Sequence, residues 1–444
     1  MTGVTKVKQC TLSLAAAMLF GATQVHADMR ISENGLGDAV YVPYLTVDDG
    51  HDSLISVSNH AATPSYARVI ISEANNGQST LYFDVFLPPD STWTAAVSSG
   101  SDGAVLNSNS SVCTVPAIPA QGVALRNFNY ADTYADGGSS GLARTRNGAV
   151  EVIERGGLSG DLANLTIAKA CADLVQAYLN FDSNPRAGQV VAPSGDIEAT
   201  VQVVSVTEGR IFSVPGVALQ GFVGQPRTEL KIAEPVDRFF TPIPESGAVD
   251  FVTQSERGRL RFDVARGADA VSSLFMSEST RGEVYTAPGL GAATSWILSF
   301  PTKAAYVSAQ PGTLAQNGMA APPFADFFDA EGACETVVRT DKRADGTVKA
   351  GGPVETELCA QVNRLDFGPD DEGVSLMNFG GSGTRAISAT LIGDTDEPVV
   401  LHGLPVVGVR LTSFINAQVV PGVLANYTYA ERLRARSGAV EPAD

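Results

Sequence analysis

The sequence predicts a mainly β protein, built from two or three antiparallel β-sandwich modules with a small helical insert. Three observations predict this class. Apolar and polar residues alternate over short runs, polar turn clusters separate these runs, and 44 Gly and 24 Pro among 444 residues are many for a helical protein. With 44% hydrophobic and 18% charged residues, the composition also excludes intrinsic disorder and allows a sizeable core.

Residues 1–27 have the three parts of a secretory signal peptide. Lys6 and Lys8 form a basic start, residues 11–22 form an apolar run, and a small residue ends the segment. The apolar run is shorter than the roughly 20 residues that a bilayer-spanning helix needs. We therefore expect cleavage before Asp28, and an uncleaved amphipathic anchor is the alternative.

Two runs show the alternation of a strand most clearly. In residues 81–87 the odd-numbered positions are all apolar, and Pro88 and Pro89 end the run. Residues 196–203 place apolar groups on one face and polar groups on the other, so we expect both runs to be half-buried antiparallel strands. Further strands are expected at residues 39–47, 53–58, 67–72, 296–300, 386–392 and 406–412.

One segment has the periodicity of a helix. Over residues 161–179 apolar residues recur every three or four positions, with Cys171 on the apolar stripe and Ser159 or Asp161 as the N-cap. We expect a single helix here. The expected organisation is a signal peptide at 1–27, a first β-sandwich region at 28–135, a loop and helical insert at 136–190, a second β region at 191–308, and a Pro/Gly-rich link with a third β region at 309–444.

Four cysteines follow the expected cleavage site: Cys113, Cys171, Cys334 and Cys359. An even number of cysteines in an exported chain is typical of disulfides formed in an oxidising compartment. Three pairings are possible. We favour Cys113–Cys171 and Cys334–Cys359, because each pair closes within one region of the chain. A zinc site is the competing use, but the sequence has no CxxC or Cys-His spacing to support it.

The chain is strongly acidic, with 30 Lys and Arg against 48 Asp and Glu and a net charge of −18. An even negative coat repels nucleic acid and anionic lipid, so we expect neither as a partner. After Asp28, Gly, Pro or a charge interrupts every long apolar stretch, and no transmembrane helix is expected. The sequence therefore predicts an exported acidic protein that is periplasmic, associated with the outer surface, or extracellular.

Six short segments are distinctive: VYVPYLTV at 40–47, DSLISVSN at 52–59, GAATSW at 291–296, FPTK at 300–303, GLPVVG at 403–408 and VLANY at 423–427. Together they resemble a group of uncharacterised exported proteins of proteobacteria. The resemblance covers most of the chain after the signal peptide. It implies secretion and a shared architecture, and it implies no activity because the group has no established function.

One segment matches a catalytic pattern. Residues 137–141 (GGSSG) fit the G-x-S-x-G pattern of serine hydrolases, which needs a buried strand running into a sharp turn and then a helix. Here polar residues precede the pattern, and only His51, His60 and His402 remain as candidate bases after the signal peptide. We therefore interpret this segment as a linker.

Acidic clusters raise the question of a metal site. Residues 48–52 include three aspartates and a histidine, and crowded carboxylates can bind Ca²⁺. Their spacing matches no known loop pattern. Residues 370–372 and 394–396 lack the glycine and terminal glutamate of an EF-hand loop. The sequence therefore assigns no metal ligand.

A pair of carboxylates could indicate a glycosidase, which needs two carboxyl groups about 5 to 10 Å apart in one cleft. Glu151 and Glu154 are three positions apart on an expected strand, so their side chains point to opposite faces and cannot form that pair. Nearby arginines, namely Arg144, Arg146 and Arg155, are expected to form surface ion pairs.

No catalytic residue and no cofactor site is predicted. We expect an exported non-catalytic β-sandwich protein with an envelope-structural or surface-interaction role, in which loops at the sandwich ends or an exposed edge strand carry recognition. Envelope proteins, surface glycans or copies of the chain itself are the expected partners. One alternative is a carbohydrate-binding or Ca²⁺-dependent adhesion module with a line of exposed aromatics, and another is a secreted hydrolase with an unrecognised active site. Trp93 and Trp296 are the aromatics considered, with a buried core position expected for each.

Overall fold

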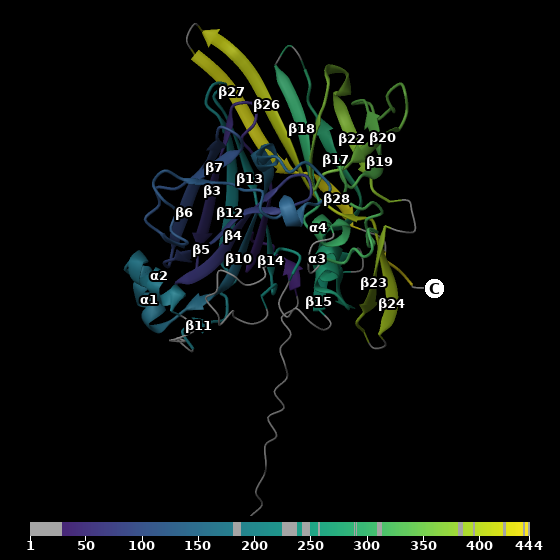
Figure 1. The fold of residues 1–444 in the computed structure, drawn as a ribbon. Coiled ribbons are helices and arrows are strands. Elements are labelled where there is room, and N and C mark those ends of the chain that lie inside the picture. Colours follow the sequence, from purple (N-terminus) through teal and green to yellow (C-terminus); the bar gives the residue numbers. More distant parts are fainter. Residues whose placement is uncertain are drawn as a thin grey trace, which may run out of the picture.

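The structure is a computed structural model in which 50% of the residues are in strands and 12% in helices (Figure 1), which confirms the expected mainly β class. The expected signal peptide at 1–27 lies outside the described residues. No helix in the described part of the chain is long and apolar enough to span a bilayer. The structure describes residues 29–180, 188–223, 238–241, 249–255, 258–287, 289, 291–308, 313–380, 385–393, 396–420, 423–437 and 440–442.

Two sheets form the first sandwich, and their facing sides build the largest hydrophobic core. One of them has six strands in the order β13 (Arg210–Pro215), β12 (Ile197–Ser205), β3 (His51–Asn59), β6 (Ser91–Ser99), β7 (Ala104–Asn107) and β9 (Val123–Ala124). In β12 every second residue from Ile197 is buried, as the alternation of the sequence predicts.

The facing sheet has thirteen strands and runs through both halves of the molecule. Its order is β29 (Val440–Pro442), β24 (Glu397–His402), β23 (Ala386–Leu391), β16 (Gly258–Val264), β15 (Val249–Ser255), β1 (Met29–Ile31), β14 (Val217–Gln220), β2 (Ala39–Thr46), β10 (Asn147–Leu158), β4 (Ser65–Glu73), β5 (Ser79–Leu87) and β8 (Cys113–Val115), with β11 (Val190–Val191) paired to β10. β1 pairs with β14 on one side and in parallel with β15 on the other, so this short strand joins the two halves.

The second sandwich lies beside the first and encloses its own core. Its four-stranded sheet has the order β21 (Val362–Asp366), β18 (Ala292–Ser299), β26 (Val407–Val420) and β27 (Val423–Arg432). Its other sheet contains β20 (Val354–Leu358), β19 (Glu335–Lys342), β22 (Gly373–Asn378), β17 (Met276–Val284) and β25 (Leu404–Pro405), with β28 (Arg434–Ser437) also paired to β17.

Strand pairing crosses the region boundaries expected at residues 135, 190 and 308. β10, from the expected insert, lies between β2 and β4. β12, from the expected second region, pairs with β3, and β18 pairs with β26 from the expected third region. The strands therefore associate by backbone hydrogen bonds between distant segments, which no local sequence pattern encodes.

The expected single helix over residues 161–179 is wrong, because the structure has two shorter helices there. α1 (Gly160–Ile167) ends where Lys169 adopts a left-handed conformation with φ of 52°, and α2 (Cys171–Leu179) follows directly. Both helices pack through Leu162 and Leu174 on the outer face of β4, β5 and β8. This cover buries both faces of β5, so residues 81–87 are not the half-buried strand that the alternation predicts.

The remaining helices are short. α3 (Gly267–Phe275) is fully buried beside β15 and β16, and α4 (Lys303–Val307) lies in the second core. Within the described residues, the connections include the 3₁₀ helices η1 (Asp132–Tyr134), η2 (Leu142–Arg146) and η4 (Pro369–Asp371).

Each sandwich core contains one fully buried tryptophan. Trp93 packs against Phe83 with ring centroids 5.2 Å apart, and Trp296 packs against Phe367 with centroids 5.1 Å apart. Both positions are on strands, β6 and β18, with the indole directed into the sandwich. Neither ring is available as a surface platform.

Two disulfides join Cys113 to Cys171 and Cys334 to Cys359, which is the pairing favoured from the sequence. The first bond connects β8 to the start of α2 and fastens the helices to the sheet. The second closes the open end of the β19–β20 hairpin, next to the paired residues Glu335 and Leu358.

Candidate functional site

The two glutamates of β10 are both fully buried and point away from each other, as the strand geometry requires. Glu151 accepts hydrogen bonds from Arg238 Nη2 at 2.6 Å and from the Phe239 amide at 2.8 Å. Glu154 accepts the Ser65 hydroxyl at 2.6 Å and the amide of Ser194 at 2.9 Å. The two carboxylates therefore do not form the acid pair of a glycosidase.

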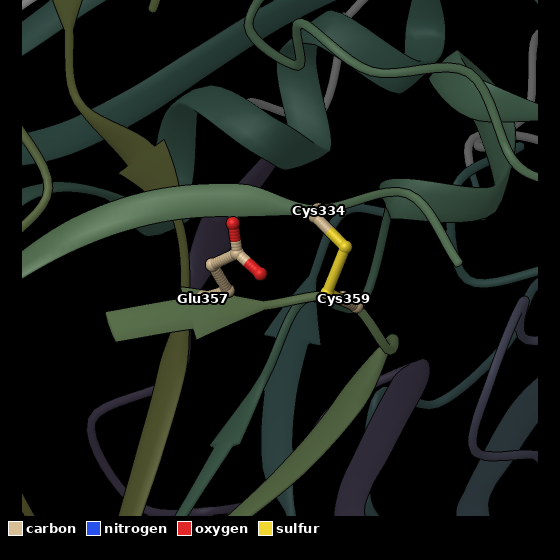
Figure 2. Close-up of side chains that lie close together, drawn as sticks. All are labelled: Cys334, Glu357 and Cys359. Atoms are coloured by element: carbon tan, nitrogen blue, oxygen red, sulfur yellow. A yellow bond between two sulfur atoms is a disulfide. The ribbon is translucent and has the colours of Figure 1, made fainter. Parts of the chain in front are cut away.

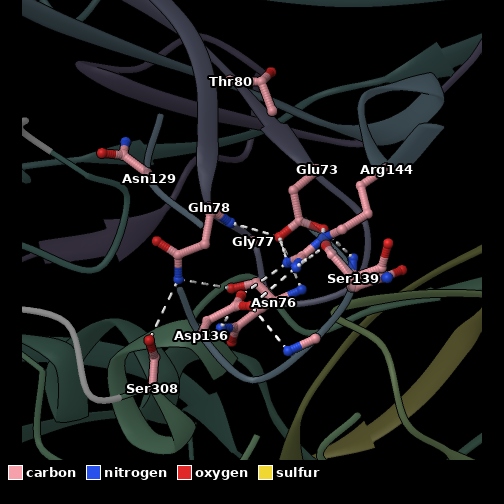
Figure 3. Close-up of polar contacts among 12 residues, drawn as sticks. Glu73, Asn76, Gly77, Gln78, Thr80, Asn129, Asp136, Ser139, Arg144 and Ser308 are labelled. Atoms are coloured by element: carbon pink, nitrogen blue, oxygen red, sulfur yellow. Dashed lines mark hydrogen bonds and ion pairs between the residues drawn. The ribbon is translucent and has the colours of Figure 1, made fainter. Parts of the chain in front are cut away.

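The expectation of surface ion pairs is wrong for Arg144. This side chain is buried and donates to Glu73 and to Asp136, each at 2.9 Å (Figure 3). Its guanidinium also lies 4.1 Å from the ring centroid of Tyr130. Only Arg146 is near the surface, with a loose contact of 3.7 Å to Asp48. The difference arises because the 3₁₀ helix η2 turns Arg144 inward, under the turn between β4 and β5.

The partner of Arg144, Glu73, organises this turn. Its carboxylate accepts the backbone amides of Asn75, Asn76 and Gln78 at 2.7 to 3.0 Å. Figure 3 shows Glu73 beside Asn76 and Gln78. The carbonyl of Ser139 accepts Arg144 Nη1 at 2.9 Å, which places the GGSSG segment in the same network. The segment leads into the 3₁₀ helix η2, so it lacks the strand–turn–helix arrangement of a nucleophile elbow.

Arg155 is also buried, and the surface expectation is wrong for it as well. Together with Arg68 it contacts Asp84, at 3.1 Å and 2.8 Å respectively. Tyr178 of α2 donates its hydroxyl to the same carboxylate at 2.7 Å. Burial raises the pKa of Asp84, but the two guanidinium groups outweigh this and hold it below its usual value. This cluster ties the helical insert to the sheet.

Metal ligands come together at one place in the described part of the chain. Potential ligand atoms of Cys334, Glu357 and Cys359 lie within 4.8 Å of one another (Figure 2). The two sulfur atoms are joined in a disulfide, so neither is the thiolate that a metal requires. In the acidic turn the Asp48 carboxylate instead accepts the Asn147 side chain at 2.5 Å. Residues 394–395 lie outside the described residues.

Exposed aromatic side chains gather at one end of the second sandwich. We define the aromatic surface as Tyr285, Phe414, Tyr427 and Tyr429. Tyr427 pairs across the β26–β27 ladder with Phe414, and Tyr429 pairs with Thr412, so the two tyrosines share one face of the hairpin. The exposed fractions are 66% for Tyr427, 36% for Tyr429 and 38% for Tyr285.

The position of the hairpin explains this exposure. Arg410 of β26 pairs with Trp296, so the aromatic side of the hairpin continues the inner face of the second sandwich. Figure 1 shows β26 and β27 extending past the neighbouring strands at the top of the molecule. The aromatic residues of the hairpin would be buried if the facing sheet were longer. Because the facing sheet ends before them, they are open to solvent.

A buried arginine holds two of these rings. The Arg410 guanidinium lies 5.5 Å from the ring centroids of both Tyr285 and Tyr429. Its own position is determined by Glu283 and Glu431, each with an oxygen 2.5 Å from a guanidinium nitrogen. Cation–π contacts and ion pairs at a partly buried site restrict the ring rotamers. The aromatic surface is therefore partly organised before any ligand arrives.

This surface was not predicted from the sequence, where Trp93 and Trp296 were the only candidates for an aromatic binding site. A signal was present in the alternation of Tyr427 and Tyr429 with polar neighbours, which places both rings on one side of a strand. The alternation does not say which side is exposed. That depends on the length of the facing sheet.

Comparison with models of protein families finds none that matches this chain, and comparison with curated proteins finds no match. No family is therefore assigned. The functional assignment depends on the side chains of the aromatic surface and their surroundings.

Proposed function

We propose that this chain is an exported, non-catalytic β-sandwich protein with a surface-interaction role in the cell envelope, and that it binds a neutral glycan through the aromatic surface. The observation that carries the proposal is the pair of exposed tyrosines on the projecting β26–β27 hairpin, Tyr427 and Tyr429, with the exposed Tyr285 at the end of β17 joined to them through Arg410. The resemblance to exported proteins and the two disulfides support an oxidising compartment.

The chemistry of the rings favours a sugar. A tyrosine presents a flat apolar face and a polar hydroxyl tip, and the C–H faces and hydroxyl groups of a pyranose complement both. Hydrogen-bonding groups lie beside the rings, since Glu283 and Glu431 are about half exposed at their side chains. A contiguous exposed aromatic patch on an otherwise polar protein marks an interaction site.

The negative charge of the protein favours a neutral glycan over an acidic one. The chain has a net charge of −18, and two carboxylates accompany the one guanidinium at the aromatic surface. An acidic polysaccharide would be repelled by this field. We therefore assign a neutral polysaccharide as the partner, in preference to an acidic one.

The experiment is affinity electrophoresis of the processed protein in gels that each contain one glycan. The glycans are a neutral glucan, chitin oligomers and alginate, which is acidic. We expect retardation by a neutral glycan and none by alginate. Replacing Tyr427 and Tyr429 together by Ala should weaken binding roughly thirtyfold, as expected for the loss of two stacking contacts of about 1 kcal/mol each. Phe128→Ala is the matched control, since this ring is 40% exposed on the other sandwich.

Two results would contradict the proposal. One is unchanged glycan binding by the double variant, and the other is absence of retardation by every neutral glycan. Size-exclusion chromatography of the same samples distinguishes the competing partner, a second copy of the chain. Concentration-dependent dimerisation that the double variant abolishes would assign the aromatic surface to self-association instead.

A further inference from the structure

A cavity of about 280 Å³ lies between the two sandwiches. β2, β3, β12 and β13 of the first sandwich contribute one wall, and β18, β21 and β26 of the second contribute the other. The cavity is separate from the aromatic surface, although both use β26. Leu411 and Ser413 line the cavity, whereas Phe414 has the opposite orientation on the strand, towards the tyrosines.

Two arginines line this one cavity, Arg210 of β13 and Arg364 of β21. Burial lowers the pKa of Arg210, and the positive charge of Arg364 lowers it further. The Nε atom of Arg210 is buried and has no hydrogen-bond partner among the described residues. A buried donor without an acceptor is costly, so the cavity as it stands is electrostatically incomplete.

The carboxylates that already pair with these two arginines do not fully neutralise their charge. Glu208 pairs with Arg210 and Asp366 with Arg364, but the side chains of these acids are 43% and 63% exposed, against 15% and 41% for the arginines. Ion pairs at such exposed positions contribute little and exchange readily with other anions. Ser413 accepts Arg210 Nη1 at 3.3 Å, which positions the guanidinium without neutralising it.

The other walls determine what kind of anion fits. Tyr44, His51 and Ser295 add polar groups, and the Asp366 carboxylate lies in the same wall, where it contacts Ser295 and Arg364. Phe212, Leu411 and Phe367 supply an apolar side. A volume of about 280 Å³ lies just below the range of roughly 300 to 1,000 Å³ for drug-sized ligands, so the cavity suits only a small molecule. Planar guanidinium groups bind carboxylate and phosphate through paired hydrogen bonds.

We propose that this cavity binds a small organic anion, whose carboxylate or phosphate group is held by Arg210 and Arg364 and whose apolar body packs against Phe212 and Leu411. The site does not depend on the glycan proposal. It gives the molecule a second ligand, bound where the two sandwiches meet.

The test is isothermal titration calorimetry of the processed, disulfide-intact protein with benzoate and phenyl phosphate as probes. Benzyl alcohol is the neutral analogue of similar shape. We expect at least one anion to bind and benzyl alcohol to bind about tenfold more weakly or not at all, because a charge-assisted contact is lost. Equal affinity for the neutral analogue, or no binding of either anion, would overturn the proposal.

Variants locate the binding. Arg210→Gln and Arg364→Gln should each weaken anion binding about tenfold, whereas Arg281→Gln, which removes an exposed arginine of β17, should not. The Tyr427→Ala, Tyr429→Ala double variant should retain anion binding, which separates this site from the glycan proposal. Anion binding that persists in both cavity variants would place the ligand elsewhere.

Chemical modification of arginines tests the same site in the wild-type protein. Phenylglyoxal modifies accessible arginines, and peptide mass spectrometry identifies the sites. We expect saturating benzoate or phenyl phosphate to protect Arg210 and Arg364 selectively, with Arg281 modified equally in both conditions. Protection at neither cavity arginine, despite measured binding, would contradict the assignment.

Discussion

The hydroxyl of Tyr178 lies 2.7 Å from the carboxylate of Asp84, which links the last turn of α2 to the centre of β5. Arg68 and Arg155 contact the same carboxylate from β4 and β10. One buried acid thus holds three donors from separate elements beneath the helical insert. Such a charge is tolerated only while its partners remain in place.

Asp84→Ala should be strongly destabilising, because two buried guanidinium groups lose their counterion. We expect the free energy of unfolding to fall by about 3 to 5 kcal/mol. Urea denaturation followed by circular dichroism measures this loss. Asp102→Ala, at an exposed loop acid, is the control and should change the stability by less than about 0.5 kcal/mol. Equal effects of the two substitutions would show that the Asp84 cluster is not a structural requirement.

The two arginines of η2 offer a matched comparison. Arg144→Gln removes a buried charge that joins Glu73 and Asp136, so we expect a loss of about 3 to 5 kcal/mol. Arg146→Gln removes only a half-exposed contact to Asp48, worth under about 1 kcal/mol. Chemical denaturation of both variants tests the difference, and a loss at Arg146 as large as that at Arg144 would contradict it.

Removal of a disulfide should lower stability by an amount that grows with the logarithm of the length of the loop it closes. On the chain-entropy model, Cys113–Cys171 with a separation of 58 residues contributes about 4 kcal/mol, and Cys334–Cys359 with a separation of 25 contributes about 3 kcal/mol. Paired Cys→Ala variants and guanidinium denaturation measure these values. Free-thiol titration of the wild-type protein, expected to find none among these four cysteines, is the independent check.

The raised pKa of Asp38 predicts that the stability of the folded protein depends on pH. Burial raises its pKa to about 6, although the amides of Phe222 and Val223 donate to its carboxylate and oppose the shift. The folded protein therefore holds this proton more tightly than the unfolded chain. The associated stabilisation, roughly 3 kcal/mol, is complete below pH 4 and is lost as the pH rises through 6.

Carbon-13 NMR of labelled aspartate measures this titration directly. A carboxyl resonance that titrates near pH 6 in wild type and disappears in Asp38→Asn would support the assignment. If every resolved aspartate titrates below pH 4.5, the interpretation of Asp38 is wrong.

The sequence by itself determined the class of fold and favoured one of the three possible disulfide pairings, which the structure then showed. Alternation of apolar residues depends on the two-residue repeat of a strand, which is a local property, so β12 could be predicted from residues 196–203 alone. The cysteines could be paired because each pair is close along the chain. The broken helix at Lys169 could not be predicted, since one residue in a left-handed conformation interrupts a periodicity that continues across it.

Only the tertiary structure decided which polar groups are buried and which aromatic groups are exposed. Arg144 and Arg155 are of a residue type usual at surfaces. Arg155 is buried because β10 lies inside its sheet, between β2 and β4, and Arg144 is buried because η2 turns it under the β4–β5 turn towards Glu73. Tyr427 has the pattern of a core residue, and it is exposed because its hairpin extends past the facing sheet. Burial is a property of what packs against a residue, and that depends on segments hundreds of positions away.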